Sequence, residues 1–323
     1  MRKVGQNFFW GGIMALGELL PGVGMQTVAI IAGLYDDMIM FFYQGTEFVR
    51  ILLQFFFQKA KKEDVITAFW AIDWKFGIPV AVSLVFIVAL LSGPIHTAFE
   101  TYPAQLAAIS FGLVFGTLPI PLREMTQKTW KEVLLAGTTF IAFVIFFSLN
   151  ATEFGVAREI NVFLYFVAGL IAAFAGFFPG ISISFALLIM GLYQPLFGAI
   201  NQLISGNWSL PALATIFFFG SGLLLGMLFC VRMLSYFLHK YRTLFLAFIF
   251  GLIAASLRAV WPFLSETGEV LLPWEVRIST FTSQVALITV AFLLVSGVRK
   301  LAEGKGTFST SFGPKEKTIV TTY

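Results

Sequence analysis

Charged residues are scarce in this sequence. Only 12% of its 323 residues are Asp, Glu, Lys or Arg, whereas a soluble domain carries roughly 25%. The chain has one cysteine, Cys230, which excludes an intrachain disulfide framework and a cysteine-based metal site. Its two histidines, His96 and His239, lie far apart in the sequence with no carboxylate pattern around them. We therefore expect neither a metal site nor a cofactor.

Apolar residues take the place of the missing charge. The hydrophobic fraction is 58%, and 39 residues are Phe. Long apolar runs between short charged loops are typical of bilayer-spanning helices, each of which needs about 20 residues. The sequence predicts an all-α, polytopic membrane protein. It contains no Gly-x-x-x-x-Gly-Lys-(Ser/Thr) motif and no soluble nucleotide domain, so we expect no ATP-driven step. The basic loops are explained by membrane orientation, and no nucleic-acid partner is expected.

The distribution of basic residues predicts the orientation. Lys and Arg cluster in the loop 59–75 and near both ends of the chain, and positively charged loops stay in the cytoplasm. We therefore expect both termini to be cytoplasmic and a single transmembrane domain over 1–302. The Gly-, Ser- and Thr-rich tail 303–323 has no apolar period and is expected to be disordered.

A Pro-Gly pair inside an apolar run occurs twice. Pro179-Gly180 follows Pro21-Gly22 by 158 residues, and the Gly-Leu-Tyr ending at Tyr193 follows that ending at Tyr35 by the same number. Proline breaks a helix interior, and glycine admits a positive φ. Unpaired backbone is tolerated at membrane depth only where it faces protein or a water-filled cavity. The two copies therefore indicate broken or re-entrant helices at a transporter binding site.

A second internal match supports a repeat. Tyr102 is followed by Phe-Gly-Leu-Val at 111–114, and Tyr241 is followed by Phe-Gly-Leu-Ile at 250–253, at an offset of 139 residues. Loop charges predict that the first of these helices runs inward and the second outward, so the repeats are expected to be inverted. The first half then holds 19 more residues than the second, and the 59–75 loop is the natural place for them. The expected boundaries are repeat one at about 5–120, a linker span at about 121–160, repeat two at about 161–260 and a final span at about 276–298.

Polar residues follow each break. A half-helix that begins after a break exposes free backbone N–H groups and the positive end of its dipole, which suit a phosphate or a carboxylate. Gly24, Gln26 and Thr27 follow the first break, and Ser182 and Ser184 follow the second. If the repeats are inverted, the two N-termini can face one another near the bilayer midplane. The alternative is that the hydroxyls bond to their own helices and that Gly24 serves only close packing.

Three ionisable residues lie within or beside apolar runs. Glu18 precedes the first break by three residues, and such a group is costly unless it has a function. It could carry a coupling proton or Na⁺, or cap exposed N–H groups. Arg50 could hold a phosphate or pair with Glu47, three residues away. Arg258 could hold a phosphate or extend toward the outer interface. The candidate substrate-binding residues are Glu18, Pro21, Gly22, Gly24, Gln26, Thr27, Arg50, Pro179, Gly180, Ser182, Ser184 and Arg258.

These motifs resemble those of the bacterial and archaeal polyprenyl-phosphate transporter family, PopT. That family's first motif is an acidic residue, two apolar residues and Pro-Gly-Val-Ser-Gly-Gly-Thr, leading to a Gly-x-Tyr. Its second is Pro-Gly-Ile-Ser-Gly-Ser-Phe leading to the same ending. The matching residues are Glu18, Pro21, Gly22, Val23, Thr27, Gly33, Tyr35, Pro179, Gly180, Ile181, Ser182, Ser184, Phe185, Gly191 and Tyr193. The likeness extends over the chain to about residue 300.

The resemblance implies a function. It implies that the chain flips undecaprenyl phosphate across the cytoplasmic membrane of a prokaryote. This movement returns the carrier lipid for envelope glycan synthesis. The resemblance also implies that the chain is not an enzyme. The sequence departs from the family at Gly24, where the family has Ser, at Met25, Gln26 and Ile183, where it has Gly, and at Glu18, where Asp is usual. These departures bear on how closely the backbone can approach a phosphate.

Other functions fit some of the same features. An ion-coupled carrier of a small soluble anion could use the same two half-helix N-termini. A polyprenyl-diphosphate phosphatase would need a nucleophile or general base beside the phosphate, and no such Ser- and His-bearing constellation is present. A purely structural membrane protein would leave the duplicated breaks unexplained.

Overall fold

The structure is a computed structural model of the chain. It describes residues 4–304 except 21–22, 127–128, 149–161, 182, 184–185, 188–189 and 264–269. Regular structure in this part of the chain consists of helices, as the sequence predicts. Their bounds are α1 Val4–Leu19, α2 Gly24–Ile31, α3 Tyr35–Phe56, α4 Lys62–Ala71, α5 Trp74–Thr101, α6 Pro103–Thr117, α7 Pro119–Glu124, α8 Trp130–Ser148, α10 Val162–Ala175, α12 Tyr193–Ile204, α13 Leu210–Lys240, α14 Arg242–Ser256 and α15 Ile278–Gly304.

Several helices are suited to a bilayer. Four stretches are long and apolar enough to cross it, namely Trp74–Leu91, Pro103–Glu124, Leu210–Leu238 and Ile278–Lys300. Other helices are shorter. The 16 residues of α1 and the 8 residues of α2 are about 24 Å and 12 Å long, less than the roughly 30 Å of a hydrocarbon core. The prediction of an all-helical membrane protein is confirmed.

The glycine of each Gly-Leu-Tyr motif ends a helical segment. Gly33 and Gly191 have φ values of 62° and 70°, a left-handed conformation that glycine adopts without a steric penalty. The next N–H closes the turn, with Leu34 donating to Ala29 at 2.7 Å and Leu192 donating to Leu187 at 2.9 Å. This is a Schellman ending. The tyrosine of each motif then begins the following helix, α3 or α12.

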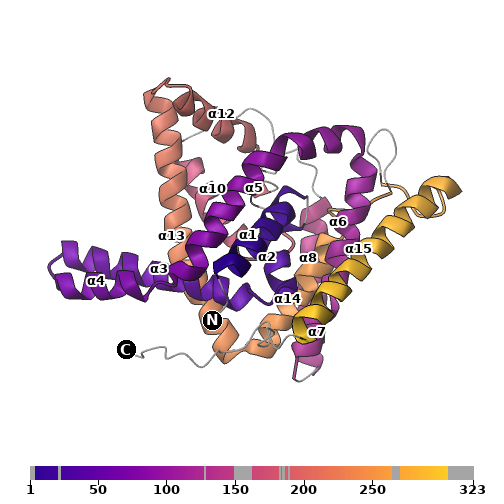
Figure 1. Cartoon of the computed structure of the whole chain (residues 1–323), viewed down its shortest axis with the longest axis horizontal. Coiled ribbons are helices and arrows are strands. Elements are labelled where there is room, and N and C mark those ends of the chain that lie inside the picture. Colours follow the sequence, from indigo (N-terminus) through magenta and orange to yellow (C-terminus); the bar gives the residue numbers. More distant parts are fainter. Residues whose placement is uncertain are drawn as a thin grey trace.

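The second sequence match corresponds to a pair of similar helices. Helices α6 and α14 each have 15 residues and begin after a tyrosine, with φ and ψ of −134° and 50° at Tyr102 and −128° and 41° at Tyr241. Helix α6 packs against α15, and α14 packs against α8 (Figure 1). The helix covering each one therefore comes from the other half of the chain. Inversion of the two halves across a membrane stays a prediction.

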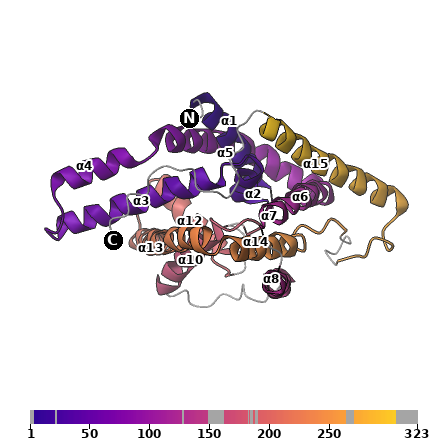
Figure 2. The same cartoon turned by 90° about the horizontal axis from the view of Figure 1, so that it is seen from below.

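Two groups of helices face each other across the core. Figure 2 shows α1, α5, α6 and α15 on one side and α8, α10, α13 and α14 on the other. One large cluster of buried apolar side chains joins them. It includes Val23 and Val28 from the first break, Ile181 from the second, and Leu246 and Ile249 from α14.

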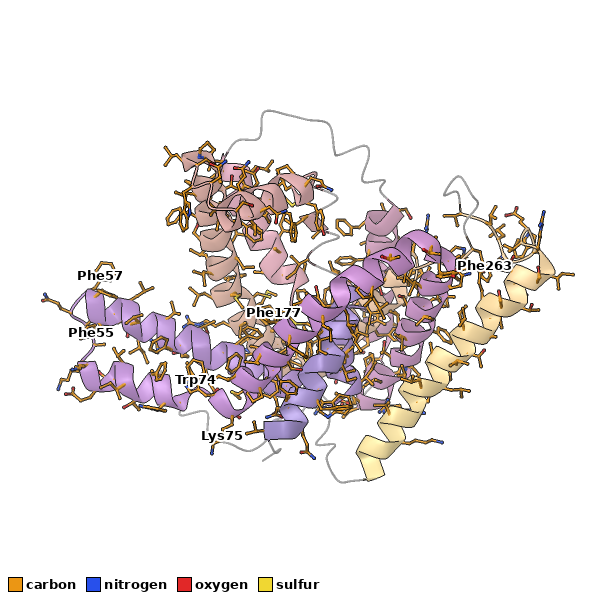
Figure 3. The ribbon with its side chains drawn as sticks, turned by 45° about the horizontal axis from the view of Figure 1, so that its top comes forward. Phe55, Phe57, Trp74, Lys75, Phe177 and Phe263 are labelled. Carbon is orange, nitrogen blue, oxygen red and sulfur yellow. The ribbon has the colours of Figure 1, made fainter. Side chains whose placement is uncertain are left out.

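The charged stretch 59–75, expected to be a loop, contains the helix α4. Helices α3 and α4 pack together as a hairpin that extends from the rest of the protein (Figures 1 and 2). Phe55 and Phe57 lie at its far end, whereas Phe177 lies in the interior (Figure 3). Helix α3 has 22 residues and its counterpart α12 has 12, so the hairpin accounts for much of the length excess of the first half.

Close packing of α14 on α8 generates the first prediction. A Cβ added at Gly251 would collide with the carbonyl oxygen of Ala136, whereas one added at Gly137 meets nothing within 4 Å. We expect Gly251→Ala to destabilise the protein by about 1–3 kcal/mol, as overpacking does. Gly137→Ala is the matched control and should be neutral or slightly stabilising, because alanine favours helix. Thermal unfolding in detergent measures both, and equal melting temperatures would contradict the packing described.

Candidate functional site

At the first interruption, the chain turns back on itself. Helix α1 ends at Leu19 and α2 begins at Gly24; Pro21 and Gly22 lie outside the described residues. A Cβ on Gly17 would lie 3.0 Å from the carbonyl oxygen of Gly24, so the two helices are in direct contact. The carboxylate of Glu18 accepts a hydrogen bond from the N–H of Met25 at 3.0 Å. Glu18 thus caps the N-terminus of α2, which is one of the roles expected for it.

Polar atoms converge on Gly24. This residue has a φ of 66°. A Cβ at this position would collide with the Oε1 atom of Gln26 and would lie 3.9 Å from the Oε2 atom of Glu18. The side chains of Gln26 and Thr27, which follow in the first turn of α2, are each 1% exposed. A buried cluster of polar groups therefore surrounds the beginning of the half-helix.

This cluster binds directly to the second half of the chain. The Nε2 atom of Gln26 donates to the carbonyl of Gly176 at 2.6 Å and to that of Ala175 at 3.4 Å. The hydroxyl of Tyr35 donates to the carbonyl of Phe177 at 2.9 Å. Helix α10 ends at Ala175, so these carbonyls belong to the helix end, where intrahelical partners run out. Side chains of the first half satisfy carbonyls left free by the second.

The second interruption is also buried. Pro179 and Gly180 lie in a buried turn after α10, and Gly180 has a φ of 88°. A Cβ at Gly180 would come within 2.7 Å of Ser256 at the end of α14. Two candidate residues of this break, Ser182 and Ser184, lie outside the described residues. The structure therefore brings together Glu18, Gly24, Gln26 and Thr27 with the backbone at 175–177, immediately before Pro179.

Two buried polar atoms of the cluster have no hydrogen-bond partner in the described part of the chain. They are the Oε1 atom of Gln26 and the hydroxyl oxygen of Thr27. An unsatisfied buried polar group costs about 1–3 kcal/mol and calls for an explanation. The Thr27 hydroxyl can donate to an oxygen atom, and so can free N–H groups in the first turn of α2. Among the described residues, no group of three His, Cys, Asp or Glu side chains is placed to hold a metal.

The two candidate arginines are placed differently. Arg50 lies 15 residues after Tyr35 on α3, about 22 Å along the helix, and pairs with Glu47 at 2.7 Å. The predicted pairing of neighbours is confirmed, and Arg50 does not lie at the breaks. Arg258 follows Ser256, the neighbour of Gly180, by two residues. Its chain segment is thus close to the second break.

One residue of the cluster was absent from the sequence-based candidates. Tyr35 marks the Gly-Leu-Tyr motif in the sequence, and the structure adds that its hydroxyl joins the two halves. Its side chain is fully buried, and a buried tyrosine hydroxyl usually has a partner. The place of Tyr35 in the duplicated Gly-Leu-Tyr motif was therefore the sequence signal that could have identified it as a site residue. The sequence does not identify the hydrogen-bond partner of its hydroxyl.

The fold and the site together define a helical membrane protein in which the beginning of α2 meets the end of α10 in the core. The chain belongs to the VCA0040-like, undecaprenyl phosphate translocase-like family, whose model matches residues 14–272. A polyprenyl-phosphate transporter of Vibrio cholerae is 28% identical over 320 residues, covering 92% of this chain and 96% of that protein. A polyprenyl-phosphate transporter of Staphylococcus aureus is 26% identical over 222 residues, covering 66% and 76%. No solved structure matches the chain significantly.

The hydrogen bond from Tyr35 generates the second prediction. Tyr35→Phe removes the donor to the Phe177 carbonyl and leaves that carbonyl buried, which should cost about 1–3 kcal/mol. Tyr193→Phe, at the equivalent position of the other motif, is the matched control. The hydroxyl of Tyr193 has no hydrogen bond to the described residues. We expect a lower melting temperature for Tyr35→Phe alone, and an equal change in both variants would argue against the contact.

Proposed function

We propose that this protein translocates undecaprenyl phosphate across the cytoplasmic membrane of a prokaryote, with both termini in the cytoplasm. Membership of the translocase-like family and two relatives named polyprenyl-phosphate transporters support this function. The observation that carries it is the contact between the two interruptions, where Gln26 and Thr27 keep buried polar atoms without partners. The names of the relatives also favour a transporter over an enzyme.

The phosphate group binds at the N-terminus of α2. The first-turn N–H groups and the hydroxyl of Thr27 donate to its oxygens, and the positive end of the helix dipole favours its negative charge. The side chain of Gln26 fills the space beside Gly24, so the headgroup approaches the backbone there as that side chain moves aside. The prenyl chain stays in the surrounding hydrocarbon, where burial of each CH₂ contributes about 0.8 kcal/mol, so only the headgroup needs a polar path.

Glu18 competes with the phosphate. Its carboxylate already accepts the N–H of Met25 at 3.0 Å, and a second anion at the same helix end would face like-charge repulsion in a weakly screened site. Protonation of Glu18 removes the repulsion and weakens the cap, which frees the N–H group for the phosphate. Release of the proton would then expel the phosphate. This makes H⁺ the coupling ion that we propose, in preference to Na⁺.

The two halves supply the path for alternating access. In our proposal they form inverted repeats, with the cluster around Gly24 near the bilayer midplane and the break at Pro179 opposite it. Inverted repeats with discontinuous helices at midplane sites are known in secondary transporters, which rock one part against the other around a central site. The hydrogen bonds from Gln26 and Tyr35 to the carbonyls of Gly176 and Phe177 would then change as the halves move.

The hydroxyl of Thr27 tests the binding site. Thr27→Val should slow translocation at least about tenfold, because a hydrogen bond to a charged group contributes about 1.5–3 kcal/mol. Thr117→Val is the matched control, since Thr117 is also buried but bonds within its own helix, to the Val114 carbonyl at 2.6 Å. The measurement is loss of outer-leaflet polyprenyl phosphate from proteoliposomes, followed with a membrane-impermeant phosphatase. Equal rates in the two variants would exclude the hydroxyl from the site. If wild-type protein does not translocate the lipid but takes up a labelled soluble anion, the proposed function is wrong.

The competition by Glu18 generates a further prediction. Between pH 7 and 9 the charge of a phosphate monoester is nearly constant, because its second pKa is about 6. Glutamine at position 18 carries no charge, so it removes the repulsion between this side chain and the phosphate. Glu18→Gln should therefore bind the lipid at least about tenfold more tightly than wild-type protein in this pH range, the equivalent of about 1.4 kcal/mol.

Its control is Glu63→Gln, which changes an exposed carboxylate on α4. This variant should keep the wild-type affinity. Binding is measured by titration of polyprenyl phosphate in detergent micelles. A Glu18→Gln variant that binds the lipid with wild-type affinity would exclude Glu18 as the coupling group.

A further inference from the structure

A cluster of positively charged side chains lies away from the site around Gly24. A cavity of about 320 Å³ lies between the C-terminal end of α3 and the helix α13. Its lining residues, here called the α3–α13 groove, are Arg50, Leu53, Gln54, Phe57, Lys59, Leu228 and Arg232. Three of the seven are cationic in a chain with only 12% charged residues.

The cationic residues of the groove are only partly neutralised. Glu47 bridges two of them, with 2.7 Å to Arg50 and 2.6 Å to Arg232. Lys59 lies within 4 Å of no carboxylate in the described part of the chain. Three positive side chains and one negative one leave a net charge of +2. A phosphate monoester carries about −1.5 to −2 at pH 7, whereas a diester carries a single charge, so the monoester matches the groove better.

The geometry of the α3 ending fixes Lys59 beside the groove. The N–H of Lys59 donates to the carbonyl of Gln54 at 2.8 Å, and that of Gln58 donates to the carbonyl of Phe55 at 3.0 Å. This is a Schellman ending in which Gln58, with a φ of 57°, takes the left-handed position that glycine usually occupies. A non-glycine residue in this conformation is uncommon. The backbone therefore holds the lysine above the last turn of α3.

An apolar strip on α13 leads away from the groove into the hydrocarbon. Positions three, four, seven and eight residues before Arg232 lie on the same face of the helix. These are Phe229, Leu228, Leu225 and Leu224, and three of them are strongly exposed, at 62%, 55% and 60% for Phe229, Leu225 and Leu224. This strip lies in the span candidate Leu210–Leu238. A ligand in the groove thus has charge at one end and a lipid-facing strip at the other.

The charged residues of the groove have no counterparts at the repeat-equivalent positions. At the offset of 158 residues, the positions equivalent to Glu47 and Arg50 are Ser205 and Trp208, and at 139 residues the equivalent of Arg232 is Gly93. Helix α3 connects the groove to the site at the first interruption, since Tyr35 begins it and Arg50 lies near its other end. The groove is therefore on one side of the protein and linked to the central site by one rigid helix.

We propose that the α3–α13 groove binds the headgroup of a lipid phosphate monoester at the membrane surface, with its chain along the apolar strip of α13. The inference rests on the proposed function, because the transported lipid is itself such a monoester. It adds a second, surface site where the headgroup is held on the side of the α3–α4 hairpin before entry to the central site or after release from it. Arg232 and Lys59 contact the phosphate, and Glu47 positions the two arginines.

The test is lipid binding to the full-length protein. Native mass spectrometry counts bound molecules of polyprenyl phosphate, of phosphatidic acid, a monoester with different chains, and of phosphatidylglycerol, a diester. We expect the double variant Lys59→Gln, Arg232→Gln to lose one bound monoester lipid, with at least a tenfold lower affinity for both monoesters and unchanged affinity for phosphatidylglycerol. The matched control is Lys62→Gln, which removes an exposed lysine of α4 outside the groove.

Each outcome decides between the proposals. Unchanged monoester binding in the double variant overturns the groove site, and so does an equal loss of all three lipids, which indicates a general anionic surface. Melting temperatures check that the double variant is folded. The single variant Lys59→Gln leaves both ion pairs of Glu47 in place and should show a smaller loss of monoester binding.

Thr27→Val should retain groove binding while translocation falls. Groove binding by a wild-type protein that translocates no lipid would refute the proposed function and leave the surface site standing.

Discussion

A backbone carbonyl at the end of an interrupted helix needs a hydrogen-bond donor, and at membrane depth no bulk water supplies one. Here the donors come from the other half of the chain. Gln26 and Tyr35 donate to the carbonyls at 175–177, at the end of α10. These contacts lock two halves that are remote in sequence into one core, and they require Gln26 and Tyr35 to stay buried. Together with the shared apolar core, these hydrogen bonds hold the beginning of α2 against the end of α10.

The same contacts explain how one departure from the family pattern is accommodated. Where the family has glycine, this chain has Gln26, whose amide nitrogen satisfies carbonyls of the other half while its oxygen stays buried without a partner. Glu18 in turn caps α2 with a negative charge. The beginning of α2 is therefore occupied by the protein's own groups. In the proposed function, the phosphate replaces an internal interaction there, and its binding changes the contacts between the two halves.

The sequence predicts some parts of this structure better than others. Apolar run length and charge distribution are enough for an all-helical membrane protein, and the Gly-Leu-Tyr motifs mark the turns at Gly33 and Gly191 because left-handed backbone favours glycine. The helix α4 was not foreseen, since its charged residues are equally typical of a loop. The partners of Gln26 and Tyr35 are carbonyls, which every residue carries, so no sequence pattern could identify them. Arg50 illustrates the reverse case, because the sequence already offered its neighbour Glu47 as one of two partners, and the structure shows this ion pair.

Helices α6 and α14 are each covered by a helix from the other half of the chain. This packing has a consequence for biosynthesis. Helix α6 ends at Thr117, but the helix that covers it, α15, begins at Ile278. Ribosomes add about 5–20 residues per second, so α6 waits on the order of ten seconds or more for its permanent neighbour. During that interval the small-residue face around Gly112, which fits against Ile288, is exposed to lipid or to insertion factors. Assembly of the first half is thus complete only when the end of the chain has been made, and nascent chains that stop earlier present an unfinished surface to quality-control proteases.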